Sequence, residues 1–426
     1  MKRNLIFALV VLLVFSGCES DLMSPVFNRP AKEEFKMSPV PDCVPLVEII
    51  VEDGKGIVSK EDYVNVDIKV KEGNTFVLHA SGKAKGRGNA TWGYPKKPYK
   101  IKFDEKQPMC GFPENKDWVL LADYCDKSLM RTAYMCDISE ALKVDYPVRY
   151  RHVHLSVNGM YKGVYILTDQ VEKKKHRVDI EEDGFLFEND NYAHNEPLLF
   201  VTAKKGYRFT FKYPDAEDGE ITVGDENYKY ILSFMNQFEA ALYGENFKDP
   251  ELGYRKYIDV ESFAKWFLVA ELTANHDPNM YYVLPKKGAK LRKGPLWDSE
   301  YSLGTSYRGA PTGAWGAPPR KPDPHQKIWS RWKYFGRLFE DPYFKSQVRK
   351  EWEEFKPRIP ALKQKMTELA YSINEAQAMN FARWPVFGSY LGASIINLDS
   401  WEEEVQYNAD FLDTRIEWMD GFLAEP

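Results

Sequence analysis

The fold is decided first by residues 153–167, VHLSVNGMYKGVYIL. Val153, Leu155 and Val157 recur at every second position, which is the period of a strand with one apolar face. The dipeptide Asn158-Gly159 comes next, and a second β-rich run follows it. Asn-Gly between two such runs is the strongest short-range signal for a hairpin. The stretch therefore predicts two strands joined by a tight turn.

The same pattern continues towards the N-terminus. Between Val64 and Val70, apolar residues alternate with polar ones, which indicates another half-buried strand. One helix is expected to interrupt the strands, from Lys127 to Leu142. We therefore expect residues 44 to about 215 to be rich in β-structure.

After about residue 225 the hydrophobic period changes to that of helices. One apolar face is formed by Tyr228, Ile231, Leu232, Met235, Phe238 and Leu242. Three later helices are expected to be capped at Asp259, at Asp341-Pro342, and at Ser400 with Glu403. Residues 304–325 are rich in Gly and Pro and predict a long loop. Residues 216 to 426 should thus be mainly helical.

Strands followed by helices indicate an α+β chain, with a β-rich N-terminal lobe, an α-rich C-terminal lobe and a cleft between them. The 426 residues are 44% hydrophobic and 15% aromatic, so the chain has ample material for a core and is not disordered. The formal net charge of −5 provides no basic field, so nucleic acid is not an expected partner.

The first residues predict export. Lys2 and Arg3 precede an apolar run from Leu5 to Phe15, and Ser16-Gly17-Cys18 ends the segment. This run is shorter than the roughly 20 residues that span a bilayer, so residues 1–18 are interpreted as a signal peptide with lipidation at Cys18. A plain secretory signal with an incidental cysteine is the alternative.

The polar, Pro-containing residues 19–43 are interpreted as a tether between the lipid and a domain at 44–426. The expected location is the cell envelope, at the outer membrane or cell surface. Contact with the membrane is expected through the lipid anchor only.

One candidate site segment is a cationic turn and strand. Arg87-Gly88-Asn89 begins a polar turn, and Lys96, Lys97, Lys100 and Lys102 follow closely. The planar guanidinium of arginine and the point charges of lysines suit a phosphate-bearing ligand. The commoner fate of such lysines is an exposed, solvated strand.

Two acidic segments could complement these cations. Asp277, in Asn275–Asn279, could orient a nucleophile or hold a cation, although from the residues alone a turn that satisfies its own backbone is the favoured interpretation. Asp298 and Glu300 lie two residues apart, so on an extended chain they face the same side and could share Mg²⁺. Paired surface acids are the plain alternative, and a glycosidase pair is a weaker one.

Together these segments resemble the CotH kinase family, the atypical protein kinases similar to spore-coat protein H. The matching motifs are Arg87-Gly88-Asn89, Lys96-Lys97-Pro98-Tyr99, Asn275-His276-Asp277 and Trp297-Asp298-Ser299-Glu300. Further similar stretches are Trp118–Tyr124, Lys127–Arg131 and Asn158–Tyr165. The His-Arg-Asp and Asp-Phe-Gly signatures of classical kinases are absent from the sequence.

The resemblance implies a bilobal, atypical protein-kinase-like fold that binds ATP and Mg²⁺ between its lobes. It implies transfer of the γ-phosphate to a protein hydroxyl, here on a protein at the cell envelope. The implied metal ligands are Asp298, Glu300 and Asp277, with Asp277 and Asp298 also assigned as catalytic. The implied nucleotide-binding residues are Arg87, Asn89, Lys97 and Lys100, with Lys97 preferred over Lys100 for the phosphate.

One position departs from the family pattern. Glu300 stands where the family has aspartate, and its longer side chain shifts the carboxylate by about one bond, which matters for the strict geometry of Mg²⁺. The competing interpretation is a catalytically inactive, kinase-like surface lipoprotein that binds glycans or proteins, since the 11 Trp and 26 Tyr residues permit stacking on sugars.

Overall fold

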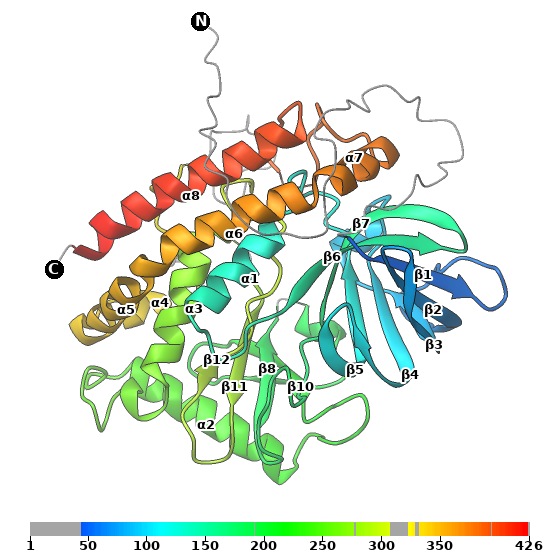
Figure 1. The fold of residues 1–426 in the computed structure, drawn as a ribbon. Helices are drawn as coiled ribbons and strands as arrows, with labels where there is room; N and C mark the ends of the chain where they lie inside the picture. Colours follow the sequence, from blue (N-terminus) through cyan, green and yellow to red (C-terminus); the bar gives the residue numbers. More distant parts are fainter. Residues whose placement is uncertain are drawn as a thin grey trace, which may run out of the picture.

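Seven of the described strands close into a barrel (Figure 1). The computed structural model describes residues 44–190, 192–276, 278–306, 323–328, 332–392 and 394–424. The order around the barrel is β1-β2-β3-β4-β5-β7-β6, and β1 closes it by pairing in parallel with β6. The strands are β1 (Leu46–Val51), β2 (Val64–Glu72), β3 (Thr75–Gly86), β4 (Tyr99–Met109), β5 (Phe112–Leu121), β6 (Tyr150–Val157) and β7 (Met160–Asp169).

Apolar side chains from alternate positions fill the barrel. In β2, Val66, Ile68 and Val70 are buried, so the predicted alternation is confirmed. In β6, however, His152 and His154 are buried as well as Val153, Leu155 and Val157. This strand is therefore covered on both faces, which its sequence did not indicate.

The predicted hairpin joins β6 to β7. Asn158 and Gly159 have φ angles of 51° and 75°, the left-handed conformation that a tight two-residue hairpin requires at both positions. The Asn158 side chain also accepts a hydrogen bond of 2.8 Å from the backbone N–H of Val51. The hairpin is thus fixed to the neighbouring strand β1.

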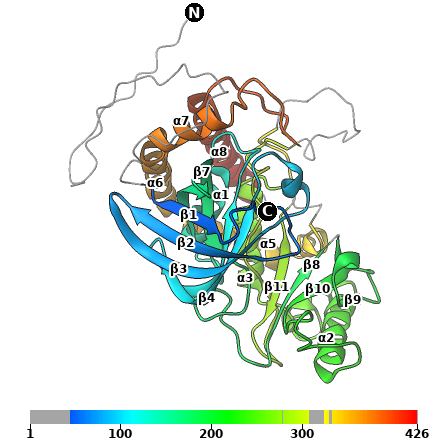
Figure 2. The ribbon, with the colours of Figure 1, turned by 90° about the vertical axis from the view of Figure 1, so that its right-hand side faces the viewer.

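A second sheet of five strands has the order β12-β11-β8-β10-β9. Its strands are β8 (Phe185–Asn189), β9 (Leu199–Val201), β10 (Arg208–Tyr213), β11 (Met280–Leu284) and β12 (Arg292–Lys293). Because β11 pairs with β8, a strand from beyond residue 225 completes a sheet begun before residue 215. Figure 2 shows this sheet and α2 on one side, apart from barrel strands β1 to β4.

The helices are α1 (Arg131–Ala141), α2 (Glu226–Leu242), α3 (Val260–Leu272), α4 (Phe335–Leu338), α5 (Pro342–Phe355), α6 (Ile359–Ser372), α7 (Asn374–Arg383) and α8 (Trp401–Ala424). Short 3-10 helices are η1 (Ala90–Gly93), η2 (Ala193–Asn195), η3 (Tyr254–Lys256) and η6 (Lys356–Arg358). The predicted caps at Asp259, Asp341 and Ser400 are confirmed, since each accepts from a backbone N–H group in the first turn of α3, α5 or α8. The Glu403 side chain accepts from the N–H of Asp399 and not of Ser400, so the predicted capping box is formed only in its first half.

A buried ion pair joins α8 to α3. Arg415 donates to the carboxylate of Glu271 at 2.6 Å, and both side chains are fully buried. The same guanidinium donates to the backbone carbonyls of Pro324 and Gln326, each at 2.7 Å. The last helix therefore holds both α3 and a segment that precedes α4.

The mixed α and β content agrees with the predicted class, whereas the division into two lobes stays a prediction. Within the described ranges, no helix is both long and apolar enough to cross a membrane. The predicted signal peptide, Cys18 and the tether lie outside the described residues, as does most of the predicted loop at 304–325.

Candidate functional site

Three segments far apart in the sequence meet at one end of the barrel. Arg87 follows the end of β3, and its guanidinium carbon lies 5.6 Å from the centre of the Trp297 ring. The backbone N–H of Cys125, in the turn after β5, donates to the carboxylate of Glu300 at 2.5 Å. The cationic turn, the turn at 122–130 and the segment at 297–300 therefore form one site.

The turn after β5 supplies two buried carboxylates. Asp123 adopts a φ of 42° and accepts a hydrogen bond of 3.0 Å from the hydroxyl of Thr132. Asp126 accepts from the backbone N–H of Ser128 at 2.9 Å and from that of Arg131 at 2.8 Å, and it also pairs with the Arg131 guanidinium. Asp126 is thus fully engaged in holding the start of α1, while Asp123 keeps one carboxylate oxygen free of any hydrogen bond within the described chain.

Lys96 is a buried cation close to these acids. Its ammonium donates to the carbonyl of Val164 at 2.5 Å and to the side-chain oxygen of Asn380 at 3.0 Å, and it lies 4.9 Å from the centre of the Tyr165 ring. Gly163 provides the space, because a Cβ there would lie 3.0 Å from Lys96 Cε. Strand β7 and helix α7 thus hold the lysine side chain together.

The charges of this cluster shift one another's proton affinities. Burial raises the pKa of Asp123 to about 7, and the charge of Asp126 adds to that rise. Burial raises the pKa of Glu300 to about 8, and the charge of Asp123 adds to it. Burial lowers the pKa of Lys96 to about 7, against the opposing effect of Asp123 and Glu300. A site that crowds carboxylates in this way would gain from an added cation.

Asp298 is the solvent-accessible acid of the site. Desolvation by the surrounding chain raises its pKa, and the charge of Arg87 opposes that rise. Asp298 has a φ of 65°, so the chain is not extended at this residue. The expectation that Asp298 and Glu300 face the same side assumed an extended chain, and that assumption is wrong. Asp298 is exposed and Glu300 is buried, because the left-handed residue turns the chain between them.

The described residues on either side of Asp277 are fastened to the same segment. Asn275 donates through its side chain to the carbonyl of Asp298 at 2.8 Å. The backbone N–H of Asn279 donates to the carbonyl of Trp297 at 3.2 Å. Asp277 itself lies outside the described residues, and its role stays a prediction.

The other predicted nucleotide-binding residues make no hydrogen bond or ion pair with these acids among the described contacts. Lys97 donates to the backbone carbonyl of Trp92 at 2.5 Å and lies over that indole ring. Lys100 pairs with Asp117 at 3.3 Å on the outer face of the barrel. Asn89 is exposed at the start of η1, where its side chain does not cap the helix. The structure thus brings Arg87, Asp298 and Glu300 together, without Lys97, Lys100 or Asn89.

Sequence reasoning did not select Lys96 or Asp123 as site residues. Both lie inside motifs that carry the family resemblance, and Asp123 is an acid directly after a buried strand. An acid at the end of a buried strand was the sequence feature that could have identified Asp123 as a site residue. For Lys96 no local signal existed, since its neighbour Lys97 has the same chemistry and sits in the same motif.

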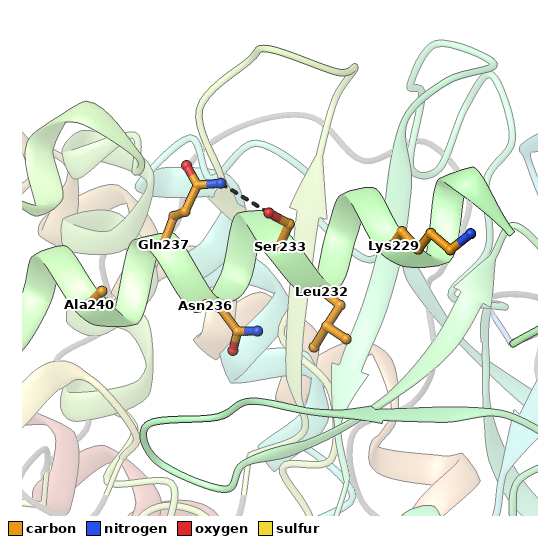
Figure 3. Close-up of a pocket in the computed structure, with 6 residues that line it drawn as sticks. All are labelled: Lys229, Leu232, Ser233, Asn236, Gln237 and Ala240. Carbon is orange, nitrogen blue, oxygen red and sulfur yellow. Dashed lines mark hydrogen bonds between the residues drawn. The ribbon is translucent and has the colours of Figure 1, made fainter. Parts of the chain in front are cut away.

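No group of three or more His, Cys, Asp and Glu side chains among the described residues is arranged to hold a metal ion. A hollow of about 440 Å³ lies elsewhere, along one face of α2 (Figure 3). It is lined by Lys229, Leu232, Ser233, Asn236, Gln237 and Ala240. All six belong to one helix, and none is a residue of the charged cluster at the barrel end.

The described elements form a mixed α and β protein in which buried acids and cations gather at one end of the barrel. The chain belongs to the CotH kinase family, because a family model described as CotH kinase protein matches residues 84–419. This confirms the resemblance and points to a kinase-like function.

One similar solved structure is the crystal structure of the golgi casein kinase, with 8% identity and a TM-score of 0.26, covering 88% of this chain and 73% of that chain. So low a similarity transfers no residue from that protein to this one. No curated protein matches the chain.

Proposed function

We propose that this chain is an exported, lipid-anchored protein kinase that transfers the γ-phosphate of ATP, with Mg²⁺, to a hydroxyl of a protein at the cell envelope. The observation that carries the proposal is the convergence of Arg87, Lys96, Asp123 and Asp298 at one end of the barrel. Phosphoryl transfer needs positioning and charge neutralisation more than covalent help, so such a cluster supplies what the reaction requires.

The acids suit Mg²⁺ through their chemistry. Magnesium prefers oxygen ligands and usually keeps several waters, so one or two carboxylates and the substrate phosphates suffice to hold it. Asp298, an exposed residue, is the best available ligand, and the raised pKa values of Asp123 and Glu300 are consistent with a missing positive charge. When bound, the metal would neutralise charge on the phosphates.

The cations have separate tasks in this proposal. Lys96 replaces Lys97 as the lysine that contacts phosphate oxygens, because Lys96 faces the acids while Lys97 is bound to Trp92. Arg87, held against Trp297, adds a fixed positive charge beside Asp298. Both side chains are positioned before the ligand arrives, which lowers the cost of ordering them.

The acids complete the arrangement. Glu300 holds the turn that carries Asp123 through its hydrogen bond with Cys125, in addition to its proposed role at the metal. Asp277 is proposed to lie near the acceptor hydroxyl, because Asn275 and Asn279 fasten its turn to the segment of Asp298. The replacement of aspartate by Glu300 is then compatible with activity, since its carboxylate has a defined partner.

Calorimetric titration with ATP, with and without Mg²⁺, tests the proposal, together with transfer of labelled γ-phosphate to envelope proteins. We expect binding that requires Mg²⁺ and is lost in Asp298→Asn, while Asp104→Asn, an exposed aspartate of β4, binds normally. Lys96→Met should lose binding and Lys97→Met should keep it. Glycan binding by a wild-type chain that has no affinity for ATP would contradict the proposal and favour the inactive binding module.

A further inference from the structure

The β2–β3 hairpin presents two large apolar side chains to solvent. Phe76 and Val77 are 55% and 53% exposed, and they lie next to each other near the tip of the hairpin. Lys69 lies 6.0 Å from the centre of the Phe76 ring, and Lys71 is the cross-strand neighbour of Phe76. Aromatic and aliphatic side chains flanked by lysines suit the boundary between lipid headgroups and acyl chains.

The described chain begins beside this hairpin. Leu46, in the first strand, pairs with Lys71, and Lys71 pairs with Phe76. Neighbouring strands lie about 4.8 Å apart, so the start of β1 and Phe76 are separated by about 10 Å across two strand spacings. Any anchor that precedes residue 44 is therefore connected to the same end of the barrel.

The predicted anchor alone would not fix how the domain sits on a membrane. Between Cys18 and Val44 lie residues 19–43, which when fully extended could reach at most about 90 Å. A tethered surface, however, has an effective concentration of about the millimolar range, so even a weak second contact is well populated. Two exposed apolar side chains suffice for such a contact.

We propose that the tip of the β2–β3 hairpin, with Phe76 and Val77, contacts the lipid bilayer to which the chain is anchored. This goes beyond the lipid anchor and rests on the proposed lipidation of Cys18, not on the kinase activity. Lys69 and Lys71 are balanced by Glu48, the cross-strand neighbour of Lys69, and by Glu72 at the tip. The contact is therefore mainly apolar and depends little on anionic lipid or salt.

The proposal sets the orientation of the candidate site. Phe76 and Arg87 lie eleven residues apart, at opposite ends of β3, which corresponds to about 36 Å along the strand. With the hairpin on the bilayer, Arg87 and the acids face away from the lipid. The acceptor protein would then be reached in the aqueous space and not at the membrane surface.

Hydrogen exchange of the lipidated protein in phosphatidylcholine nanodiscs, with and without phosphatidylglycerol, tests the contact. After correction for intrinsic rates, we expect slower exchange at residues 71–79 in the wild type than in Phe76→Ser/Val77→Ser, with either lipid mixture. Met160, 59% exposed at the hairpin between β6 and β7, provides the matched control. Met160→Ser should keep the protection at 71–79.

Equal exchange at 71–79 in the wild type and the double variant would overturn the proposal. Protection at 158–162 would overturn it as well, because it would place the opposite end of the barrel on the bilayer. An intact mass that lacks the lipid on Cys18 would also overturn it, since two side chains do not hold a protein at a bilayer unaided. Binding of ATP is measured separately, so a failed contact and a failed kinase proposal are distinguishable.

Discussion

The guanidinium of Arg87 stacks over the indole of Trp297 at 5.6 Å, and this contact joins the end of a barrel strand to the segment that carries Asp298. Trp297 belongs to the same buried cluster as Val119 of β5 and Tyr281 of β11. The charge beside Asp298 is therefore supported by the barrel on one side and by the second sheet on the other.

Substitutions of Arg87 can distinguish the effect of its charge on ATP affinity from the effect of its stacking on stability. We expect Arg87→Ala to lower ATP affinity about tenfold or more, as for a lost charged contact, and to lower the free energy of unfolding by about 0.5–1 kcal/mol. Arg87→Lys should restore part of the affinity. Titration calorimetry and urea unfolding measure the two effects. The exposed Arg151 of β6 is the control, and an equal loss of affinity in Arg151→Ala would contradict a specific role.

Glu300 should make the ligand-free protein less stable at alkaline pH. Its folded pKa is raised from 4.5 to about 8, so its contribution is present below pH 4.5 and is lost as the pH rises towards 8. Each tenfold difference in proton affinity corresponds to about 1.4 kcal/mol. Glu300→Gln keeps an acceptor for Cys125 and removes the charge, so the variant should become the more stable protein by pH 8.

Urea unfolding of wild type and Glu300→Gln between pH 5 and pH 9 measures this difference. The buried His152 and His154, whose pKa values are lowered to about 4 by burial, act in both proteins and cancel. A difference that stays constant with pH would show that Glu300 is ionised throughout. Addition of Mg²⁺ and ATP should reduce the pH dependence of the wild type.

Gly163 and Gly159 offer a matched pair of substitutions. Both have positive φ, but a Cβ at Gly163 would lie 2.6 Å from the Asn380 side-chain oxygen, while nothing lies within 4 Å of one at Gly159. Gly159→Ala should cost about 1–2 kcal/mol of stability from backbone strain alone. Gly163→Ala should cost about 1–3 kcal/mol more and weaken ATP binding, because it displaces Lys96. Similar thermal melts and similar ATP affinities would refute the proposed support of Lys96.

Lys293 should be a destabilising residue. Its ammonium lies 4.0 Å from the centre of the Trp266 ring and 3.9 Å from that of Tyr282, and it makes no hydrogen bond to another described residue. Burial lowers its pKa well below the usual value of 10.5. Lys293→Met should therefore raise the free energy of unfolding by about 1–3 kcal/mol at pH 7.

The gain from Lys293→Met should shrink as the pH rises towards 10.5, because the unfolded wild type then loses the proton that the folded state disfavours. Chemical unfolding at pH 7 and pH 10 measures both values. The exposed Lys290 provides the control, since Lys290→Met should change stability little. A destabilised Lys293→Met would show that the contacts with the two rings outweigh the cost of burial.

Local signals in the sequence predicted the local structure well. The Asn158-Gly159 turn and the caps at Asp259 and Asp341 depend on residues within four positions of each other, so the sequence contains all the information needed. The parallel pairing of β1 with β6 and the return of β11 to β8 depend on contacts about a hundred residues apart. No periodicity encodes such pairings.

The candidate site was predicted in part for the same reason. Arg87, Asp298 and Glu300, which the structure brings together, were selected because their motifs carry distinctive residue types. The sequence could not distinguish Lys96 from Lys97. Lys96 is positioned by its hydrogen bonds to Val164 and Asn380, which come from distant parts of the chain. Likewise, the exposure of Asp298 follows from its left-handed φ. No glycine or asparagine beside it indicates such a conformation in the sequence.

The bond between Arg415 and Glu271 sets a limit on how far the protein can be trimmed. A chain that stops before Arg415 would leave the Glu271 carboxylate in the core without its ionic partner, although both side chains are now fully buried. It would also release the carbonyls of Pro324 and Gln326. Protease-resistant fragments should therefore retain the last helix. An affinity tag should be added after residue 426 and should not replace that helix.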